Sequence, residues 1–136
     1  MRHFAVVAVL AAVASVTGCM GPNPAPTYDA DANRSLKFPG VLSEVGAKAK
    51  IRLPGQDVVM LVWRTPIGFG GTDLCCHHCG HELVFKAKEQ TIECPRGIVY
   101  KLDGTYISGK IRDGEKIQPL RAYLVEIDGD RLKISG

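Results

Sequence analysis

Four cysteines and three histidines gather in two short segments near the middle of the chain. The first segment runs from Cys75 to Glu82, and the second begins at Glu93 and Cys94. Thiolates and imidazoles are the side chains that bind soft and borderline metals. The apolar stretch between the segments is typical of a hairpin, which would bring its two ends together. The sequence therefore predicts a metal or iron–sulfur site.

Short alternating runs surround this region and form the elements that must position it. Apolar residues alternate with charged ones over residues 48–53 and again over residues 131–134, which predicts half-buried strands. Residues 58–63 are continuously apolar and predict a buried strand. No segment shows a helical period of useful length. We expect an all-β fold of about eight to ten short strands in a sandwich or barrel-like arrangement.

The segments between these strands predict a hairpin, a loop and two turns. Residues 83–86 are expected to pair with residues 91–94, so that the second metal-binding segment returns to the first. The glycine-rich residues 68–71 are expected to form a loop. Two Asp-Gly dipeptides are typical of hairpin turns, namely Asp103-Gly104 and Asp128-Gly129.

The N-terminal region is expected to be an export signal followed by a tether. A charged start and a short apolar core predict that residues 1–18 are a signal peptide, too short to span a bilayer. Small residues lead directly to Cys19, which resembles the lipobox of bacterial lipoproteins and predicts acylation of Cys19 in the cell envelope. An ordinary cleavage near the same place is the alternative. Residues 19–37 are expected to form a Pro-rich tether, and residues 38–136 the folded domain.

Composition and charge exclude several classes of function. The chain has 136 residues and a formal net charge of +3, and its basic residues are scattered among acidic ones. Because there is no basic stripe, we do not expect nucleic-acid binding. The sequence also lacks a Ser-His-Asp order, a paired-carboxylate motif, a phosphate loop and a dinucleotide fingerprint, so we do not expect the chain to be an enzyme by itself.

The two metal-binding segments resemble the loops of the Rieske [2Fe–2S] domain, which read C-x-H-x-G-x-x-L and C-P-x-H-G. The resemblance implies an antiparallel β-sandwich with a small cluster-binding subdomain formed by two loops. It also implies that Cys76 and Cys94 bind one iron and that His78 binds the other. The matching positions are Cys76, His78, Gly80 and Leu83 in the first loop, and Cys94 and Pro95 in the second.

The second loop departs from the family pattern at its histidine. Its sequence, Cys94-Pro95-Arg96-Gly97, is one residue short and contains no histidine. A guanidinium group has no lone pair to donate, so Arg96 cannot replace the missing ligand. His81 and His77 are the nearby candidates for the fourth ligand.

Other residues near the two segments are expected to support the site. Gly80 and Pro95 shape the loops, Pro95 through its locked φ. Tyr100 is expected to be a core aromatic whose hydroxyl could donate a hydrogen bond to a cysteine sulfur or a bridging sulfide. Cys75 and Cys79 are left over from the predicted ligand set and are available for disulfide bonds in an oxidising compartment.

These features predict a lipid-anchored Rieske-type [2Fe–2S] protein that transfers one electron at a time to a redox partner protein. One alternative is a Rieske-like scaffold that has lost its cluster and acts as an envelope binding or structural module. The other is a zinc site, because Cys76-x-x-Cys79 has the spacing of a zinc ribbon and His81 with Cys94 could complete a tetrahedron.

Overall fold

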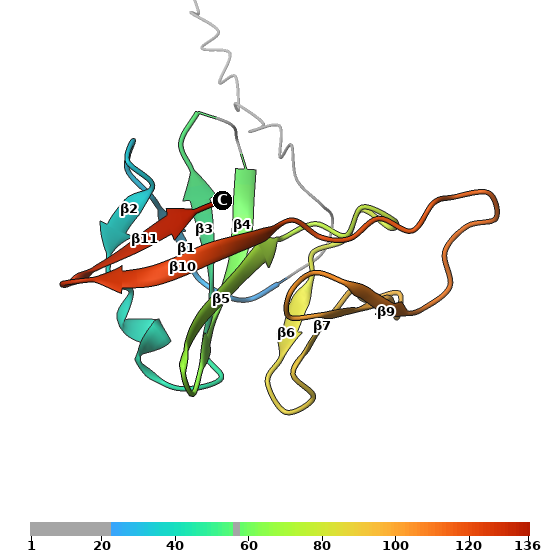
Figure 1. Ribbon diagram of the computed structural model, residues 1–136, viewed down its shortest axis with the longest axis horizontal. Helices are drawn as coiled ribbons and strands as arrows, with labels where there is room; N and C mark the ends of the chain where they lie inside the picture. Colours follow the sequence, from blue (N-terminus) through green and yellow to red (C-terminus); the bar gives the residue numbers. More distant parts are fainter. Residues whose placement is uncertain (1–22, 56–57) are drawn as a thin grey trace, which may run out of the picture.

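The structure is a computed structural model that describes residues 23–55 and 58–136. These residues form eleven strands and one short 3₁₀ helix, η1 (Gly40–Ser43). The strands are arranged in two sheets, a larger one and a smaller one (Figure 1). No helix within the described ranges has the length and apolar character that a membrane span needs. The all-β prediction is confirmed.

Seven strands form the larger sheet, in the order β1-β3-β4-β5-β10-β11-β2. β10 pairs with β5 through Ala122 and Tyr123 and with β11 through residues 124–128, so it joins the two halves of this sheet. The strands are β1 (Thr27–Asp29), β2 (Ser35–Lys37), β3 (Lys48–Leu53), β4 (Val58–Thr65), β5 (Gly68–Asp73), β10 (Ala122–Asp128) and β11 (Arg131–Ser135).

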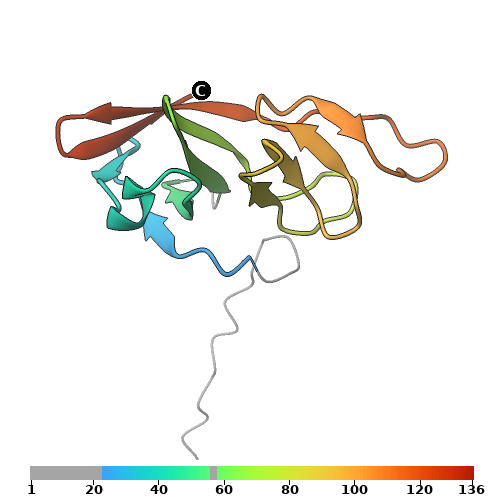
Figure 2. The same ribbon diagram turned by 90° about the horizontal axis from the view of Figure 1, so that it is seen from below.

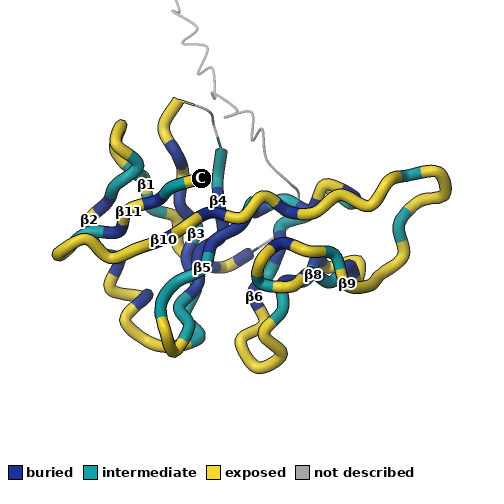
Figure 3. Tube along the Cα trace, viewed as in Figure 1, coloured by how far each residue is buried: buried dark blue, intermediate teal, exposed yellow. Residues whose placement is uncertain are grey.

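The two halves of the larger sheet pack over one apolar core. β3 buries Ala49, Ile51 and Leu53, and β11 buries Leu132 and Ile134 in the same cluster. Successive side chains of a strand point to opposite faces, so this alternation gives each strand one buried face. Buried stretches run along β3, β4 and β5, which pair side by side (Figure 3). The period-two prediction for both segments is confirmed.

Four strands form the smaller sheet, in the order β6-β7-β8-β9. β6 and β7 form the predicted hairpin, with Val84 opposite Glu93 and Lys86 opposite Thr91. After β9, residues 109–121 extend past the sheet before the chain returns as β10 (Figure 2). The strands are β6 (Val84–Lys86), β7 (Thr91–Glu93), β8 (Val99–Lys101) and β9 (Tyr106–Ser108).

β4 connects the cores of the two sheets. Its residues Met60 and Val62 belong to the core of the larger sheet, whereas Leu61 and Trp63 belong to the core of the smaller one. The Trp63 ring stacks on Phe85 of β6, with ring centroids 5.3 Å apart. A strand that is buried on both faces is continuously apolar rather than alternating, which explains the pattern of residues 58–63.

The prediction of a loop over residues 68–71 is wrong, because these residues begin β5. A Cβ atom at Gly70 would lie 2.5 Å from the Trp63 ring, and one at Gly71 would lie 2.5 Å from the Met60 methyl group. The glycines therefore leave room for large side chains of the neighbouring strand. Glycine in a strand marks such a close approach.

The folded region begins before residue 38, which corrects the predicted extent of the tether. β1 pairs with β3 in parallel, and β2 pairs with β11. Asn23 is 4% exposed, and its side-chain amide donates a 2.8 Å hydrogen bond to the Leu83 carbonyl. Strands of three residues are too short to show a period in the sequence. Cys19 and the predicted signal residues 1–18 lie outside the described residues.

Tyr123 of β10 provides a pH-dependent contribution to stability. Its hydroxyl donates a 3.0 Å hydrogen bond to Asp73, and burial together with the Asp73 charge raises the pKa of Tyr123 from 10.0 to about 12. Between these two pKa values the Tyr123 hydroxyl is ionised in the unfolded chain but still protonated in the folded chain. The free energy of unfolding therefore falls as pH rises. We expect Tyr123→Phe to lose less stability than the wild type between about pH 10 and 12, measured by urea denaturation. Equal losses in both proteins would contradict this assignment.

Candidate metal centre

Two loops of the smaller sheet bring three cysteine sulfurs together. The first loop (residues 75–82) precedes β6, and the second loop (residues 94–98) joins β7 to β8. The Sγ atoms of Cys76, Cys79 and Cys94 all lie within 4.8 Å of one another. Cys76 and Cys94 are 1% and 4% exposed, and all three cysteines are free thiols. This sulfur group is the candidate metal centre.

The backbone closes both loops in a similar way. The Gly80 N–H donates a 2.9 Å hydrogen bond to the Cys76 carbonyl, and the Gly97 N–H donates one of 2.9 Å to the Cys94 carbonyl. The two glycines have φ values of +66° and +87°, which glycine adopts readily. The Arg96 N–H lies 3.3 Å from Cys94 Sγ and donates to it. Compared with the pattern C-P-x-H-G, the second loop has one residue fewer between its cysteine and its glycine, and the missing residue is the histidine.

Hydrogen bonds set the ionisation of the sulfurs. Burial disfavours the thiolate of Cys76, but hydrogen bonds from the Tyr100 hydroxyl and from the backbone N–H groups of His78 and Cys79 outweigh burial and lower its pKa. Burial and the hydrogen bond that its own thiol donates to Cys94 raise the pKa of Cys79 to about 12. The thiolate is the form of cysteine that binds metals, so the site already favours that form at Cys76.

His78, a predicted ligand, lies outside the sulfur group and uses both of its ring nitrogens elsewhere. Nε2 accepts a 3.0 Å hydrogen bond from the Gln118 N–H. The neutral ring must therefore carry its proton on Nδ1, which lies 2.8 Å from the Tyr100 hydroxyl and donates to it. The Tyr100 hydroxyl in turn donates to Cys76 Sγ at 3.2 Å. His78 thus begins a hydrogen-bond relay that ends on a sulfur.

The remaining residues of the first loop also lie outside the sulfur group. His81 Nδ1 donates a 2.8 Å hydrogen bond to the Cys79 carbonyl, which leaves the Nε2 lone pair for another partner. His77 has a side chain that is 41% exposed, and its Nε2 lies 3.3 Å from an Asp73 carboxylate oxygen. Cys75 is not among the free thiols and has an interaction of its own.

The donor set fits the predicted Rieske centre only in part. That centre needs two cysteines on one iron and two histidines on the other. Cys76 and Cys94 can supply the cysteine pair, but neither nitrogen of His78 is available in this arrangement. Cys79, which we expected to be available for a disulfide, is instead a free thiol with its Sγ 3.1 Å from Cys94 Sγ. The residues present fit a thiolate-rich metal centre and do not fit the family's four-ligand set.

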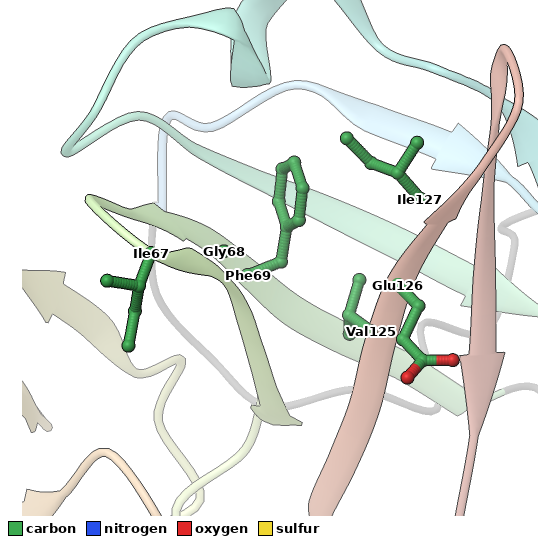
Figure 4. Close-up of a pocket in the computed structure, with 6 residues that line it drawn as sticks. All are labelled: Ile67, Gly68, Phe69, Val125, Glu126 and Ile127. Atoms are coloured by element: carbon green, nitrogen blue, oxygen red, sulfur yellow. The ribbon is translucent and has the colours of Figure 1, made fainter.

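A surface pocket on the larger sheet is separate from this centre (Figure 4). It lies between the turn that joins β4 to β5 and the middle of β10. Glu126 is the only ionisable residue in its lining, so the pocket offers no group of residues for catalysis or metal binding. The lining residues are Ile67, Gly68, Phe69, Val125, Glu126 and Ile127.

Removal of the Tyr100 hydroxyl is expected to weaken metal binding. In Tyr100→Phe the ring stays in the core, but Cys76 loses a hydrogen-bond donor and His78 Nδ1 loses its acceptor. Partners of this kind typically contribute about 10- to 100-fold to metal affinity, and we expect a loss in that range. A competition titration against a chelator measures it. Tyr123→Phe, the same change away from the loops, serves as the control, and equal affinities of the two variants would contradict this role.

Gly109 holds the backbone after β9 against the second loop. Its φ is +116°, and a Cβ atom there would lie 2.6 Å from Ile98 Cα and 2.7 Å from the Gly97 carbonyl oxygen. We expect Gly109→Ala to cost more than about 1 kcal/mol of folding free energy and to weaken metal binding by displacing this loop. Gly114→Ala is the matched control, because Gly114 also has a positive φ but nothing lies within 4 Å of its added Cβ. Chemical denaturation that shows equal costs would contradict this.

Comparisons with known proteins identify the fold. No protein-family model and no curated protein matches the chain. The cyanobacterial plasma membrane Rieske protein PetC3 from Synechocystis PCC 6803 matches with a TM-score of 0.52 and 17% identity, over 65% of this chain and 86% of PetC3. The ferredoxin of carbazole 1,9a-dioxygenase from Nocardioides aromaticivorans IC177 matches with a TM-score of 0.58 and 20% identity, over 74% of this chain and 96% of the ferredoxin. The Rieske-like fold predicted from the two loop motifs is therefore confirmed, and this chain has the Rieske fold.

Proposed function

We propose that this chain is a Rieske-type electron-transfer protein whose iron centre is held by the clustered cysteines. The observation that carries this proposal is the meeting of three free thiols on two loops of a Rieske fold. Iron bound by thiolates can take up and release one electron at a time. The sequence predicts a [2Fe–2S] cluster as the form of this iron, but the donor set described above lacks the histidine pair that such a cluster needs.

The residues around the sulfurs support such a role. Burial of Cys76 and Cys94 keeps water away from the metal-binding atoms. The Tyr100 hydroxyl and the Arg96 N–H donate to these two sulfurs and would stabilise the negative charge of metal-bound thiolates. By contrast, residues 95–97 at the tip of the second loop are exposed. We propose that a redox partner protein approaches the centre at this exposed tip.

We also propose that a lipid on Cys19 holds the protein on a membrane of the cell envelope. The backbone N–H of Asn23 donates a 2.6 Å hydrogen bond to Glu82, and the Asn23 side chain donates to Leu83, so the chain is docked beside the first loop at residue 23. Asn23 is four residues beyond Cys19, and four residues span at most about 14 Å. The lipid would therefore keep the cysteine centre near the membrane surface, within reach of a membrane-bound partner.

The lipid anchor can be tested separately by mass spectrometry of the protein extracted from membranes of its own host. We expect a mature chain that begins at Cys19 and carries acyl groups on that residue. A mature chain with an unmodified Cys19, or with residues 1–18 retained, would contradict the anchor and leave the metal centre unaffected.

Zinc binding is the second candidate function. Three of the four residues that were predicted to bind zinc, Cys76, Cys79 and Cys94, have sulfurs that lie together. The fourth, His81, uses Nδ1 in a hydrogen bond and keeps the Nε2 lone pair for a metal. Three cysteines and one histidine form an ordinary structural zinc site.

One experiment decides between the two candidates. The full chain is produced without oxygen, and its iron, zinc and acid-labile sulfide are quantified before electron paramagnetic resonance and redox titration. Bound iron with a reversible one-electron step supports electron transfer. Bound zinc with no redox step supports the zinc site and overturns electron transfer, and the absence of both metals overturns both candidates in favour of a metal-free scaffold.

A further inference from the structure

We propose that Cys79 is a metal ligand, and that the centre is a single ion bound by Cys76, Cys79 and Cys94. His78 is then a positioning residue that acts on Cys76 through Tyr100, and it does not bind the metal. The inference rests on the proposed metal centre, and it names the ligands and the number of ions.

The distances between the sulfurs indicate a single ion. A metal–thiolate bond of about 2.3 Å in tetrahedral geometry places the sulfurs of one ion about 3.8 Å apart. All three Sγ atoms lie within 4.8 Å of one another, and the Cys79–Cys94 pair lies 3.1 Å apart. In a [2Fe–2S] cluster the four ligands are divided between two irons. Three ligand atoms in mutual proximity therefore fit one ion better than a pair of ions.

The loop pattern gives Cys79 the position of a ligand. The second loop of the Rieske pattern has its ligand directly before the glycine, and this chain lacks that residue before Gly97. In the first loop Cys79 directly precedes Gly80, and the Gly80 N–H closes the loop on the Cys76 carbonyl. The spacing Cys76-x-x-Cys79 is also that of cysteines that share one metal ion. A donor gained in the first loop thus matches the donor lost from the second.

The surroundings of His78 explain why it does not bind. His78 is 7% exposed, and its ring packs against both Tyr100 and Tyr106, with centroids 6.3 Å and 6.2 Å away. Metal binding through Nε2 would leave the Gln118 N–H without its acceptor, and binding through Nδ1 would break the relay through Tyr100. Gln118 is exposed, so water can replace its acceptor, but the relay joins buried groups and breaking it costs free energy. The arrangement therefore favours the relay over metal binding by His78.

Titration of the full chain with Co²⁺, under anaerobic and reducing conditions, tests the ligand assignment. Thiolate-to-cobalt charge-transfer absorption reports the number of bound thiolates, and the end point reports the number of ions. We expect one Co²⁺ per chain, and we expect Cys79→Ser to reduce the charge-transfer absorption by about one third, because one of three thiolates is removed. We expect His78→Gln to keep the full charge-transfer absorption at saturating Co²⁺, because no thiolate is removed, but to need more Co²⁺ for saturation, because Cys76 loses its relay.

Several results would overturn the assignment. They are two Co²⁺ ions per wild-type chain, full charge-transfer absorption in Cys79→Ser, or, in His78→Gln, either reduced charge-transfer absorption at saturating Co²⁺ or an unchanged Co²⁺ affinity. Circular dichroism of the metal-free variants shows whether each has folded. Cys79 is only half-buried and packs at the edge of the smaller sheet's core, so serine, which has nearly the same size, changes this packing little, and Cys79→Ala provides a second variant with the same expected loss.

The cobalt experiment can fail independently of the proposed function. Cobalt binding involves neither iron nor an electron-transfer step. Loss of one third of the absorption in Cys79→Ser, together with zinc in the isolated protein, would support the ligand assignment and overturn electron transfer. Unchanged absorption in Cys79→Ser, together with redox-active iron in the isolated protein, would overturn the assignment and leave electron transfer standing.

Discussion

Replacement of Cys94 by serine is expected to lower metal affinity by more than about 100-fold, because partners outside the ligand set alone contribute about 10- to 100-fold. Cys94 is the cysteine of the second loop in the sulfur group. It lies 3.1 Å from Cys79 Sγ, and it accepts a hydrogen bond from the Arg96 N–H. Without its sulfur, the second loop supplies no thiolate and the two loops no longer share an ion.

A chelator competition titration of Cys94→Ser under reducing conditions provides the measurement. His77→Gln is the matched control, because His77 belongs to the first loop but pairs with Asp73 outside the sulfur group. We expect this control to bind metal as the wild type does. If Cys94→Ser binds metal with an affinity within about tenfold of the control, the shared centre is refuted, since even the loss of an outer partner costs about that much.

Replacement of Trp63 by alanine is expected to destabilise the fold by about 3–5 kcal/mol, the usual cost of removing a buried tryptophan. Trp63 is 1% exposed and stacks on Phe85, so it ties β4 of the larger sheet to β6 of the smaller one. Gly70 lies against the same ring. Because Gly70 has no side chain, it cannot fill the cavity that the lost ring would leave. The smaller sheet, and with it the two loops, would lose its main aromatic contact with the larger sheet.

Chemical denaturation of Trp63→Ala, followed by circular dichroism, measures this cost. Trp63→Phe is the matched variant and should cost less, because it keeps an aromatic ring against Phe85. It also removes Nε1, a buried donor with no partner among the described residues. A loss below about 1 kcal/mol in Trp63→Ala would show that the ring does not connect the two sheets.

Much of the fold could be predicted from local patterns. Alternation over residues 48–53 and 131–134 identified β3 and β11, because one face of each strand is buried and the other is solvated. The hairpin of β6 and β7 followed from two short apolar runs and a polar connection. The loop motifs gave the overall fold through a resemblance, which the structural comparison bears out.

The parts of the fold that were not predicted depend on contacts between distant residues. The sequence alone indicates a loop at the glycines of β5. These glycines are needed because large side chains of β4 pack against them, and this contact has no signal in the β5 sequence itself. β1 and β2 have three residues each, too few to show a strand pattern. Their pairing with β3 and β11 is what makes them strands. Such pairing is a tertiary effect without a local signal.

The candidate site was also predicted where local patterns determine it and missed where it depends on distant residues. The position of Cys76 near Cys94 follows from the hairpin, and the Cys76-x-x-Cys79 spacing is the sequence signal for the third sulfur. The predicted role of His78 was carried over from its place in the motif. What the motif does not contain is Gln118, forty positions further along the chain, whose backbone N–H occupies one of the two His78 nitrogens that could bind a metal.

X-ray absorption spectroscopy at the K-edge of the metal bound to the wild-type protein tests the central claim most directly. The structure predicts a single metal ion with three sulfur neighbours, those of Cys76, Cys79 and Cys94, at about 2.3 Å. A second metal at short distance, with imidazole nitrogens replacing one of the three sulfurs, would contradict it.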